Sequence, residues 1–379
     1  MTLNRFAFPT AIHFGAGAAA SVGPHLLEHG RRRPLVVTDR QLATLPVARR
    51  FVDGLRQAGL DAAVFDGVFG NPAASQADAG GAAYRAHRAD SVVGFGGGAA
   101  LDVAKLVGVL GSAGGPALEY AWDHPGVRPI PDDPPWFVAV PTTAGTGSEV
   151  GRSAVISEDD THVKRIVFSP RLLARAVFAD PDLTLDLPAP VTAATGMDAL
   201  THNVESYLSP AYHPLCDGIA LEGARIAARA LPVAVRDGHD RAARADMLMA
   251  SMMGAIAFQK DLGAVHSCAH ALGTVVDMHH GLANGIMIDH VMRFNADAAG
   301  EKMAELARVC GAGATAADFV AWLGRLKREV GIPAKLAEKG VTAAHIPALV
   351  EVAVNDTCHQ TNPKPCTADD FRRIFRAAI

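Results

Sequence analysis

The sequence predicts an α/β domain over residues 1–180 followed by an all-helical domain over residues 181–379. Short β-rich runs alternate with helix-length segments in the first half, and Ala-rich helical segments follow one another in the second. The length of 379 residues suits two domains of ordinary size. We expect the boundary near Asp180-Pro181-Asp182, where the pattern changes.

The elements of the first half have the order of parallel βαβ units. Strands are predicted at 34–38, 61–65, 91–95 and 136–140, and helices between them at 47–59, 73–88 and 99–110. Buried strands that alternate with helices are typical of a parallel sheet covered on both faces. Two further runs, 153–157 and 163–168, flank the polar turn Glu158-Asp-Asp-Thr161 and predict a β-hairpin.

The second half reads as helices with few strand-like runs between them. Helices are predicted at 189–209, 213–233, 238–259, 264–276, 282–296, 298–310, 315–330 and 342–354. Such a series predicts a helical domain with its own core.

Composition excludes several classes of partner. The formal net charge of −4 gives no electrostatic case for nucleic acid or for an anionic membrane surface. We find no apolar run of about 18 residues that would predict a transmembrane helix, and no secretory leader at the N-terminus. The 5 cysteines show no CxxC spacing and read as free thiols of a reducing cytosol, so we expect a cytoplasmic protein.

A set of metal ligands is predicted in the helical half. Asp198 and His202 stand four apart, as do His266 and His270, and residues with this spacing project from one face of a helix. Three imidazoles and one carboxylate suit Fe²⁺ or Zn²⁺. Each histidine alone is more readily explained as a surface or core residue. Spacing does not decide between His266 and His270, nor between the neighbours His279 and His280.

Two glycine-rich loops in the α/β half follow predicted strands. Gly96-Gly97-Gly98 opens a helix, where free N–H groups favour phosphate, although a glycine triplet can also be only a turn. The segment from Pro141 to Glu149 offers hydroxyl and backbone donors for ribose, phosphate or nicotinamide. Open parallel sheets bind ligands at this edge, so the loops predict a dinucleotide site. We expect the substrate in the cleft between the domains.

Asp39 directly follows the predicted strand Val36-Val37-Thr38. In a dinucleotide fold, a carboxylate here accepts hydrogen bonds from the adenosine ribose and repels a 2′-phosphate. Asp at this position would equally serve as a helix N-cap. The sequence is compatible with both roles of Asp39.

These stretches together resemble the iron-containing (group III) alcohol dehydrogenase family along essentially the whole chain. The matching motifs are Gly96-Gly-Gly-Ala-Ala-Leu-Asp-Val-Ala-Lys105, Pro141-Thr-Thr-Ala-Gly-Thr-Gly-Ser-Glu149, Asp180-Pro-Asp-Leu-Thr184, Thr195-Gly-Met-Asp-Ala-Leu-Thr-His202, Gly263-Ala-Val-His-Ser-Cys-Ala-His-Ala-Leu-Gly273, His280-Gly-Leu-Ala-Asn284 and Asp356-Thr-Cys-His-Gln-Thr-Asn-Pro363. The resemblance implies an N-terminal NAD-binding domain and a C-terminal metal-binding domain, an architecture shared with dehydroquinate synthase.

The resemblance also implies individual roles. The metal ligands become Asp198, His202, His266 and His280, and His270 stands near the nicotinamide and substrate, where it could relay a proton. Fe²⁺ is the expected metal, with Zn²⁺ as the alternative. The implied contacts to NAD are Asp39, Asn71, Gly97, Gly98, Asp102, Thr142, Thr143 and Lys164.

The implied activity is the interconversion of a small primary alcohol and its aldehyde by hydride transfer to and from NAD, with the metal as Lewis acid. A homodimer is expected. An alternative substrate pair is 4-hydroxybutyrate and succinic semialdehyde, because Arg152 and Arg165 could face a carboxylate. More distant alternatives are a lyase of the dehydroquinate synthase type, a metallohydrolase, and a protein that only binds these ligands.

Overall fold

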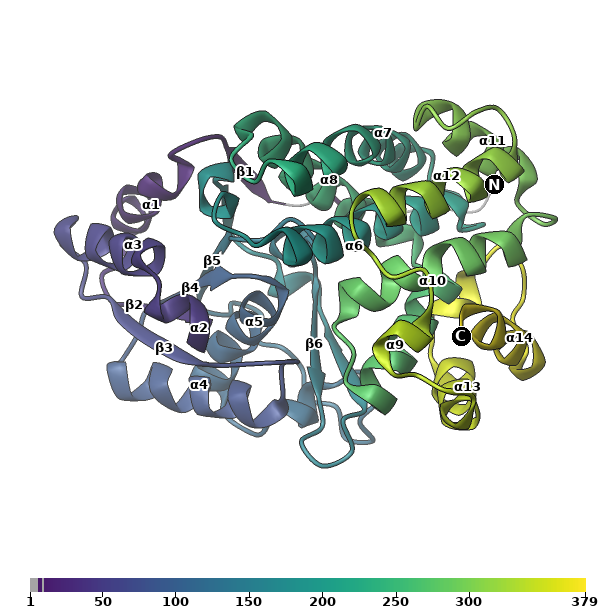
Figure 1. Ribbon diagram of the computed structural model, residues 1–379. Coiled ribbons are helices and arrows are strands. Elements are labelled where there is room, and N and C mark those ends of the chain that lie inside the picture. Colours follow the sequence, from purple (N-terminus) through teal and green to yellow (C-terminus); the bar gives the residue numbers. More distant parts are fainter. Residues whose placement is uncertain (1–5, 9) are drawn as a thin grey trace. The chain divides into compact units, whose positions relative to one another are not determined.

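The computed structural model describes residues 6–8 and 10–379 of the chain (Figure 1). Its contacts divide the chain into an α/β unit, Ala7–Thr143 with Gly147–Thr184, and a helical unit that comprises Ala144–Thr146 and Leu185–Ile379. The predicted fold class, a parallel sheet with helices followed by a helical domain, is confirmed.

A parallel six-stranded sheet forms the α/β unit. Its strands, in spatial order, are β1 (Ala11–Phe14), β8 (Ala176–Ala179), β5 (Trp136–Pro141), β4 (Ser91–Gly96), β2 (Pro34–Asp39) and β3 (Ala63–Val68). After β2 the chain adds β3 on one side and then β4 on the other. The direction of winding therefore reverses between β2 and β4, the point at which open sheets of this kind bind ligands.

Helices cover both faces of the sheet (Figure 1). On one face, α1 (Val22–Glu28) and α3 (Pro46–Gln57) form a core with alternate residues of the strands, such as Val93 and Phe95. On the other face lie α4 (Ala74–His87) and α5 (Gly98–Ala113), which contact β3 and β4 respectively. A short helix, α2 (Arg40–Thr44), follows β2 directly.

Beside the main sheet, β6 (Ser153–Ser157) and β7 (Lys164–Phe168) form the antiparallel hairpin that the sequence predicts. The sequence prediction omitted β1 and β8. Each has only 4 residues. They pair with one another although their positions are far apart in the sequence.

The helical unit is built around α6 (Ala189–Leu208), which packs against α7, α8 and α10. The other helices are α7 (Pro214–Arg236), α8 (Arg241–Ala257), α9 (Ala264–Val276), α10 (His280–Asn295), α11 (Gly300–Val309), α12 (Ala316–Glu329), α13 (Ile346–Asn355) and α14 (Ala368–Ala378). All eight predicted helices are present within a few residues of the expected bounds. The prediction missed α14, which begins at a capping box between Thr367 and Asp370.

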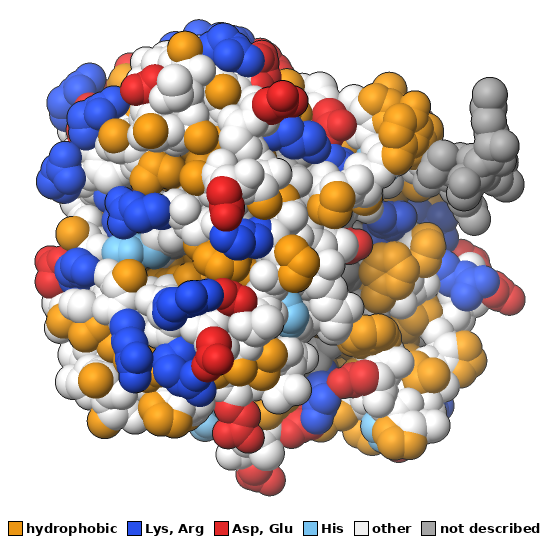
Figure 2. All heavy atoms as spheres, turned by 90° about the vertical axis from the view of Figure 1, so that its right-hand side faces the viewer, with side chains coloured by type: hydrophobic (Ala, Val, Ile, Leu, Met, Phe, Trp, Pro, Cys, Tyr) orange, Lys and Arg blue, Asp and Glu red, His pale blue; other side chains and the backbone are white. Residues whose placement is uncertain are grey.

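Basic and acidic side chains are interspersed on the face shown in Figure 2. Among the described residues, no helix combines the length and the apolar character needed to cross a lipid bilayer.

Candidate functional site

Four predicted metal ligands converge inside the helical unit. The ligand atoms of Asp198, His202, His266 and His280 all lie within 4.8 Å of one another. Asp198 Oδ1 is 3.9 Å from Nε2 of His202, 3.9 Å from Nε2 of His266 and 3.5 Å from Nε2 of His280. Three imidazole nitrogens therefore face a single carboxylate oxygen, which is the arrangement of donors around one metal ion.

Three helices bring these residues together. Asp198 and His202 lie one turn apart on α6, His266 lies in the first turn of α9, and His280 is the first residue of α10. The neighbouring His279 has a different role, because its Nδ1 accepts the N–H of Leu282 at 3.4 Å and caps α10. The structure thus places His280 in the ligand cluster and His279 at the helix cap, a distinction that sequence spacing does not make.

Burial favours the neutral form of the His202 imidazole, which is the form that binds a metal. His202 is 4% exposed, and this burial lowers its pKa from 6.5 to about 4. Its ring is therefore neutral at physiological pH and has a lone pair available for a metal.

The Asn284 side chain lies against three of the four ligand atoms. Its Nδ2 is 2.7 Å from Asp198 Oδ1, 3.4 Å from His266 Nε2 and 3.2 Å from His280 Nε2. A carboxylate oxygen and imidazole nitrogens are donors that Fe²⁺ and Zn²⁺ accept in proteins, and all four ligand atoms face one point, so these residues fit a divalent metal.

His270 belongs to a different arrangement. Its Nδ1 is 2.7 Å from Asp356 Oδ2, and Asp356 Oδ1 also accepts Ser267 Oγ–H at 2.7 Å and the N–H of Cys358 at 2.9 Å. Burial raises the pKa of Asp356, but His270 and these hydrogen bonds outweigh the burial and hold the pKa well below its usual range. His270 is thus oriented by a carboxylate.

His270, Asp356 and Cys358 also lie close enough together to hold an ion. Burial holds the pKa of the Cys358 thiol well above its ordinary value, so it remains protonated. The carboxylate oxygens of Asp356 already accept three hydrogen bonds. This chemistry favours a hydrogen-bonded pair over a second metal site.

Two carboxylates of this region were absent from the predicted site. Glu205 contacts His266, and Asp356 contacts His270, in both cases at Nδ1. Glu205 could have been found, because it follows His202 by three positions and so shares its face of α6. Asp356 lies in a motif already noted for its resemblance, but only the fold reveals its partner.

In the α/β unit, the two glycine-rich loops meet at the carboxyl edge of the sheet. Gly97 is the N-cap of α5, and an added Cβ there would lie 3.2 Å from Thr143 Oγ1. Gly96 has φ +155°, and a Cβ on it would lie 2.7 Å from Ala100 Cβ, so a side chain is excluded at this turn. The N–H of Thr142 donates to Gly96 O at 3.0 Å. Gly97, Gly98, Thr142 and Thr143 are therefore neighbours.

Asp39 stands beside this turn. Its Oδ1 accepts the N–H groups of Gln41 and Leu42 at 3.0 and 2.8 Å, which caps α2. Its Oδ2 would lie 3.8 Å from a Cβ placed on Gly96. One oxygen thus caps a helix, while the other is directed toward the glycine turn where the winding of the sheet reverses.

Asn71 and Lys164 both lie close to a hydrogen bond that joins the turn after β3 to the hairpin of β6 and β7. Asn71 is in the turn after β3, and the next residue, Pro72, accepts the N–H of Ser157 at 2.7 Å. Ser157 in turn pairs with Lys164 in the hairpin register.

Asp102 is held within the protein. Its Oδ1 accepts Ser148 Oγ–H at 2.5 Å and lies 3.2 Å from Lys105 Nζ, and its Oδ2 accepts the N–H of Val155 at 3.0 Å. The carboxylate therefore holds α5 against the loop after β5 and against β6.

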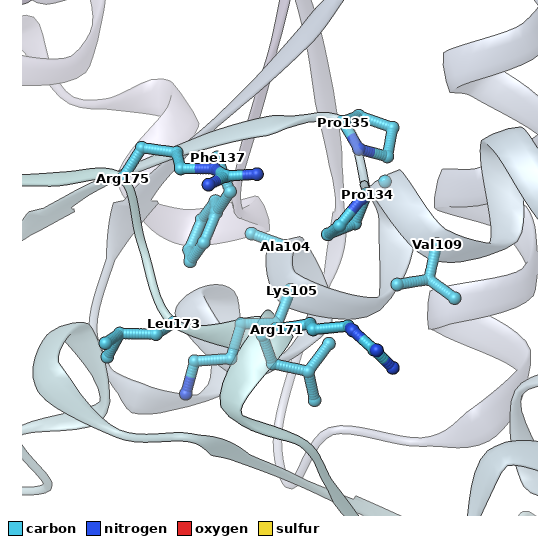
Figure 3. Close-up of a pocket in the computed structure, with 11 residues that line it drawn as sticks. Ala104, Lys105, Val109, Pro134, Pro135, Phe137, Arg171, Leu173 and Arg175 are labelled. Carbon is cyan, nitrogen blue, oxygen red and sulfur yellow. The ribbon is translucent and has the colours of Figure 1, made fainter. Parts of the chain in front are cut away.

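The pocket in Figure 3 lies elsewhere in the α/β unit. Among its lining residues, Pro134 and Pro135 precede β5 and Arg175 precedes β8. These positions mark the amino edge of the sheet, opposite the two glycine-rich loops. Lys105 also lines it, but its Nζ is bound to Ser148 Oγ at 2.7 Å and Ser153 O at 2.5 Å.

Comparisons with known proteins cover nearly the whole chain. Residues 9–181 match the family model described as iron-containing alcohol dehydrogenase, and residues 192–379 match the C-terminal model of the Fe-containing alcohol dehydrogenase family. The 4-hydroxybutyrate dehydrogenase of Cupriavidus necator is 40% identical, with 98% of each chain covered.

Solved structures of other proteins are similar to this chain over its whole length. A crystal structure of 1,3-propanediol oxidoreductase superimposes with a TM-score of 0.95 at 36% identity and covers 100% of both chains. The sulfoacetaldehyde reductase of Bifidobacterium kashiwanohense, solved in complex with NAD⁺, gives a TM-score of 0.91 at 28% identity over 100% of this chain and 99% of that one.

Proposed function

Because the chain belongs to the iron-containing alcohol dehydrogenase family, we propose that it interconverts a small primary alcohol and its aldehyde with NAD(H) and a divalent metal, Fe²⁺. The observation that carries the metal assignment is the convergence of three imidazole Nε2 atoms on Asp198 Oδ1. Membership of this oxidoreductase family decides against the lyase and metallohydrolase alternatives.

The proposed ligands are Asp198, His202, His266 and His280, and a metal held there supplies Lewis-acid chemistry for a substrate oxygen. His270 moves the proton that oxidation of an alcohol releases. Because Nδ1 of His270 is hydrogen-bonded to Asp356, Nε2 is the atom that exchanges the proton. The alternative role of His270 is packing, since its ring stacks against His280 with centroids 5.4 Å apart.

NAD is proposed to bind at the carboxyl edge of the sheet. The N-terminus of α5 has no side-chain cap, so its first N–H groups and its dipole are available to the pyrophosphate. Thr142 and Thr143 directly follow β5 at this edge. We assign further contacts to Asn71, in the turn after β3, to Lys164, the first residue of β7, and to Asp39 at the adenosine ribose. The relative solved with NAD⁺ supports this cofactor.

The substrate proposal has two candidates, a neutral alcohol or diol and 4-hydroxybutyrate. The 40% identity to a 4-hydroxybutyrate dehydrogenase favours the second. The guanidinium groups of Arg152 and Arg165 differ in the partners that they already contact. Arg165 already pairs with Asp123 at 2.6 Å and Glu158 at 2.8 Å, whereas Arg152 stacks on Phe168, with its guanidinium carbon 5.5 Å from the ring centroid. Because the Arg165 guanidinium already pairs with two carboxylates, we assign the substrate carboxylate to Arg152.

A substrate panel tests the proposed function. Metal-loaded protein should form NADH from at least one of 1,3-propanediol, short primary alcohols and 4-hydroxybutyrate, measured by NADH absorbance. The reverse reaction is assayed with the matching aldehydes. If Fe²⁺-loaded protein that binds NAD turns over none of these substrates in either direction, the proposed reaction is wrong.

Asp39→Asn should relax the preference for NAD over NADP by about tenfold in kcat/KM. Asn caps helices as well as Asp, so the variant removes the charge and keeps α2 capped. The carboxylate is partly exposed, and repulsion of a 2′-phosphate at about 4 Å is then worth about 1–2 kcal/mol. The comparison uses kcat/KM for both cofactors in the parent and the variant. Equal use of both cofactors by the parent would mean that Asp39 is only a helix cap.

The cytoplasmic location and the homodimer belong to the same proposal. The 5 cysteines are all free, as is usual in a reducing compartment. The homodimer rests on the family resemblance alone.

A further inference from the structure

Helix α6 carries a third buried polar residue in line with its two proposed ligands. Glu205 follows Asp198 by seven positions and His202 by three, so the three side chains share one face of the helix. Glu205 is 2% exposed. A buried carboxylate is costly unless hydrogen bonds or opposite charges compensate it, so its partners reveal its role.

The partners of Glu205 all lie in the first turn of α9. Oε1 accepts the N–H of Val265 at 2.7 Å, and Oε2 lies 2.6 Å from His266 Nδ1 and 3.4 Å from the N–H of His266. These donors and the positive end of the helix dipole compensate the carboxylate.

The start of α9 is shaped to admit this carboxylate. Gly263 is the N-cap of α9 and supplies no side-chain cap. An added Cβ there would lie 2.6 Å from Glu205 Oε1 and 3.0 Å from Asn362 Oδ1. Glycine at this position therefore leaves room for Glu205 to cap the helix from α6 and to reach the His266 ring.

A carboxylate at Nδ1 determines which nitrogen of His266 can bind a metal. The carboxylate only accepts, so Nδ1 carries the hydrogen and Nε2 carries the lone pair. Nε2 is the atom that faces Asp198 Oδ1. We propose that Glu205 is a positioning residue of the metal centre, which fixes the tautomer and the ring orientation of His266. This inference rests on the proposed metal site.

The test is the metal affinity of Glu205→Gln in the full-length protein. The amide oxygen can serve Val265 or His266, but not both, and the NH₂ group then faces a donor or forces the other tautomer. We expect Fe²⁺ and Zn²⁺ to bind about 10–100-fold more weakly, measured by competition with a chromogenic chelator. NAD binding serves as a measure of correct folding.

Asn362→Ala is the matched control. Asn362 Oδ1 accepts the N–H of Ala264 at 3.2 Å, and the side chain also bonds to Asn295 and to Lys364 O. This variant therefore removes a contact at the same helix start, together with the bonds to Asn295 and Lys364, but removes no hydrogen bond to His266. It should lower thermal stability and leave metal affinity unchanged. An equal loss of affinity in both variants would show that Glu205 acts only as a helix cap and would overturn the proposal.

Three further outcomes test the proposal or the metal site on which it rests. Unchanged metal affinity in a folded Glu205→Gln protein overturns the proposal. If that variant does not fold, Glu205→Asp replaces it: its shorter side chain cannot reach His266, so parent-like affinity again overturns the proposal and a loss supports it. Failure of the parent itself to bind either ion would instead refute the metal centre of the proposed function.

Discussion

Replacing His266 or His280 by alanine should remove the metal and the activity together. Each imidazole supplies one of the four converging ligand atoms. His266 is 1% exposed, so its replacement by alanine removes a buried ligand atom from the centre. Lewis-acid stabilisation is worth several kcal/mol, and about 1.4 kcal/mol corresponds to a factor of ten, so turnover should fall by at least about 10³-fold.

Metal content by elemental analysis and turnover with NAD are the two measurements. His279→Ala is the matched control, because its side chain caps α10 next to His280 and takes no part in the proposed ligand set. The control should keep both metal and turnover. Stoichiometric metal with near-normal turnover in His266→Ala or His280→Ala would refute the ligand assignment.

His270→Ala should keep its metal and its fold but lose turnover by roughly 10²-fold, the usual contribution of a positioned proton-transfer group. The reason is geometric, since Nδ1 of His270 is committed to Asp356 and the residue stands outside the four-ligand set. The pH profile of kcat should also change shape. Added imidazole should restore part of the rate, which a packing role does not predict.

Asp356→Asn is the companion variant. Its amide can donate to Nδ1 and so reverse the tautomer of His270, and we expect a loss of rate in the same direction with metal retained. A metal-free His270→Ala protein would mean that His270 replaces one of the four ligands. Unchanged rate and pH profile would mean that His270 only packs.

The sequence could predict ligand pairs within one helix but not the choice between equivalent candidates. Asp198 and His202 follow from helical spacing, because a four-residue interval is a local property. The same rule applies equally to His266 and His270. Contacts from distant segments distinguish the two histidines, because Glu205 contacts His266 and Asp356 contacts His270. A local sequence pattern does not contain these contacts.

The glycine-rich loops of the α/β unit show the same limit of prediction from local sequence. Strand, glycine turn and helix can be read from 91–113 because they are consecutive. Asp39 left two interpretations open, and the structure assigns helix capping to one oxygen while the other faces Gly96. The contacts of Asp102 with Ser148 and Val155 join segments about 50 residues apart, so local sequence could not predict them.

Titration of metal-free protein with Fe²⁺, and in parallel with Zn²⁺, tests the central claim most directly. Zn²⁺ binds such N/O sites more tightly in the usual affinity order, so protein as isolated could carry zinc, and both ions are needed. Bound metal and NADH formation are followed together. The account predicts that activity rises in proportion to bound Fe²⁺ and saturates at one ion per chain, in keeping with the four-ligand group. Equal activity with Zn²⁺ would remove the iron assignment, and full activity of the metal-free protein would contradict the account as a whole.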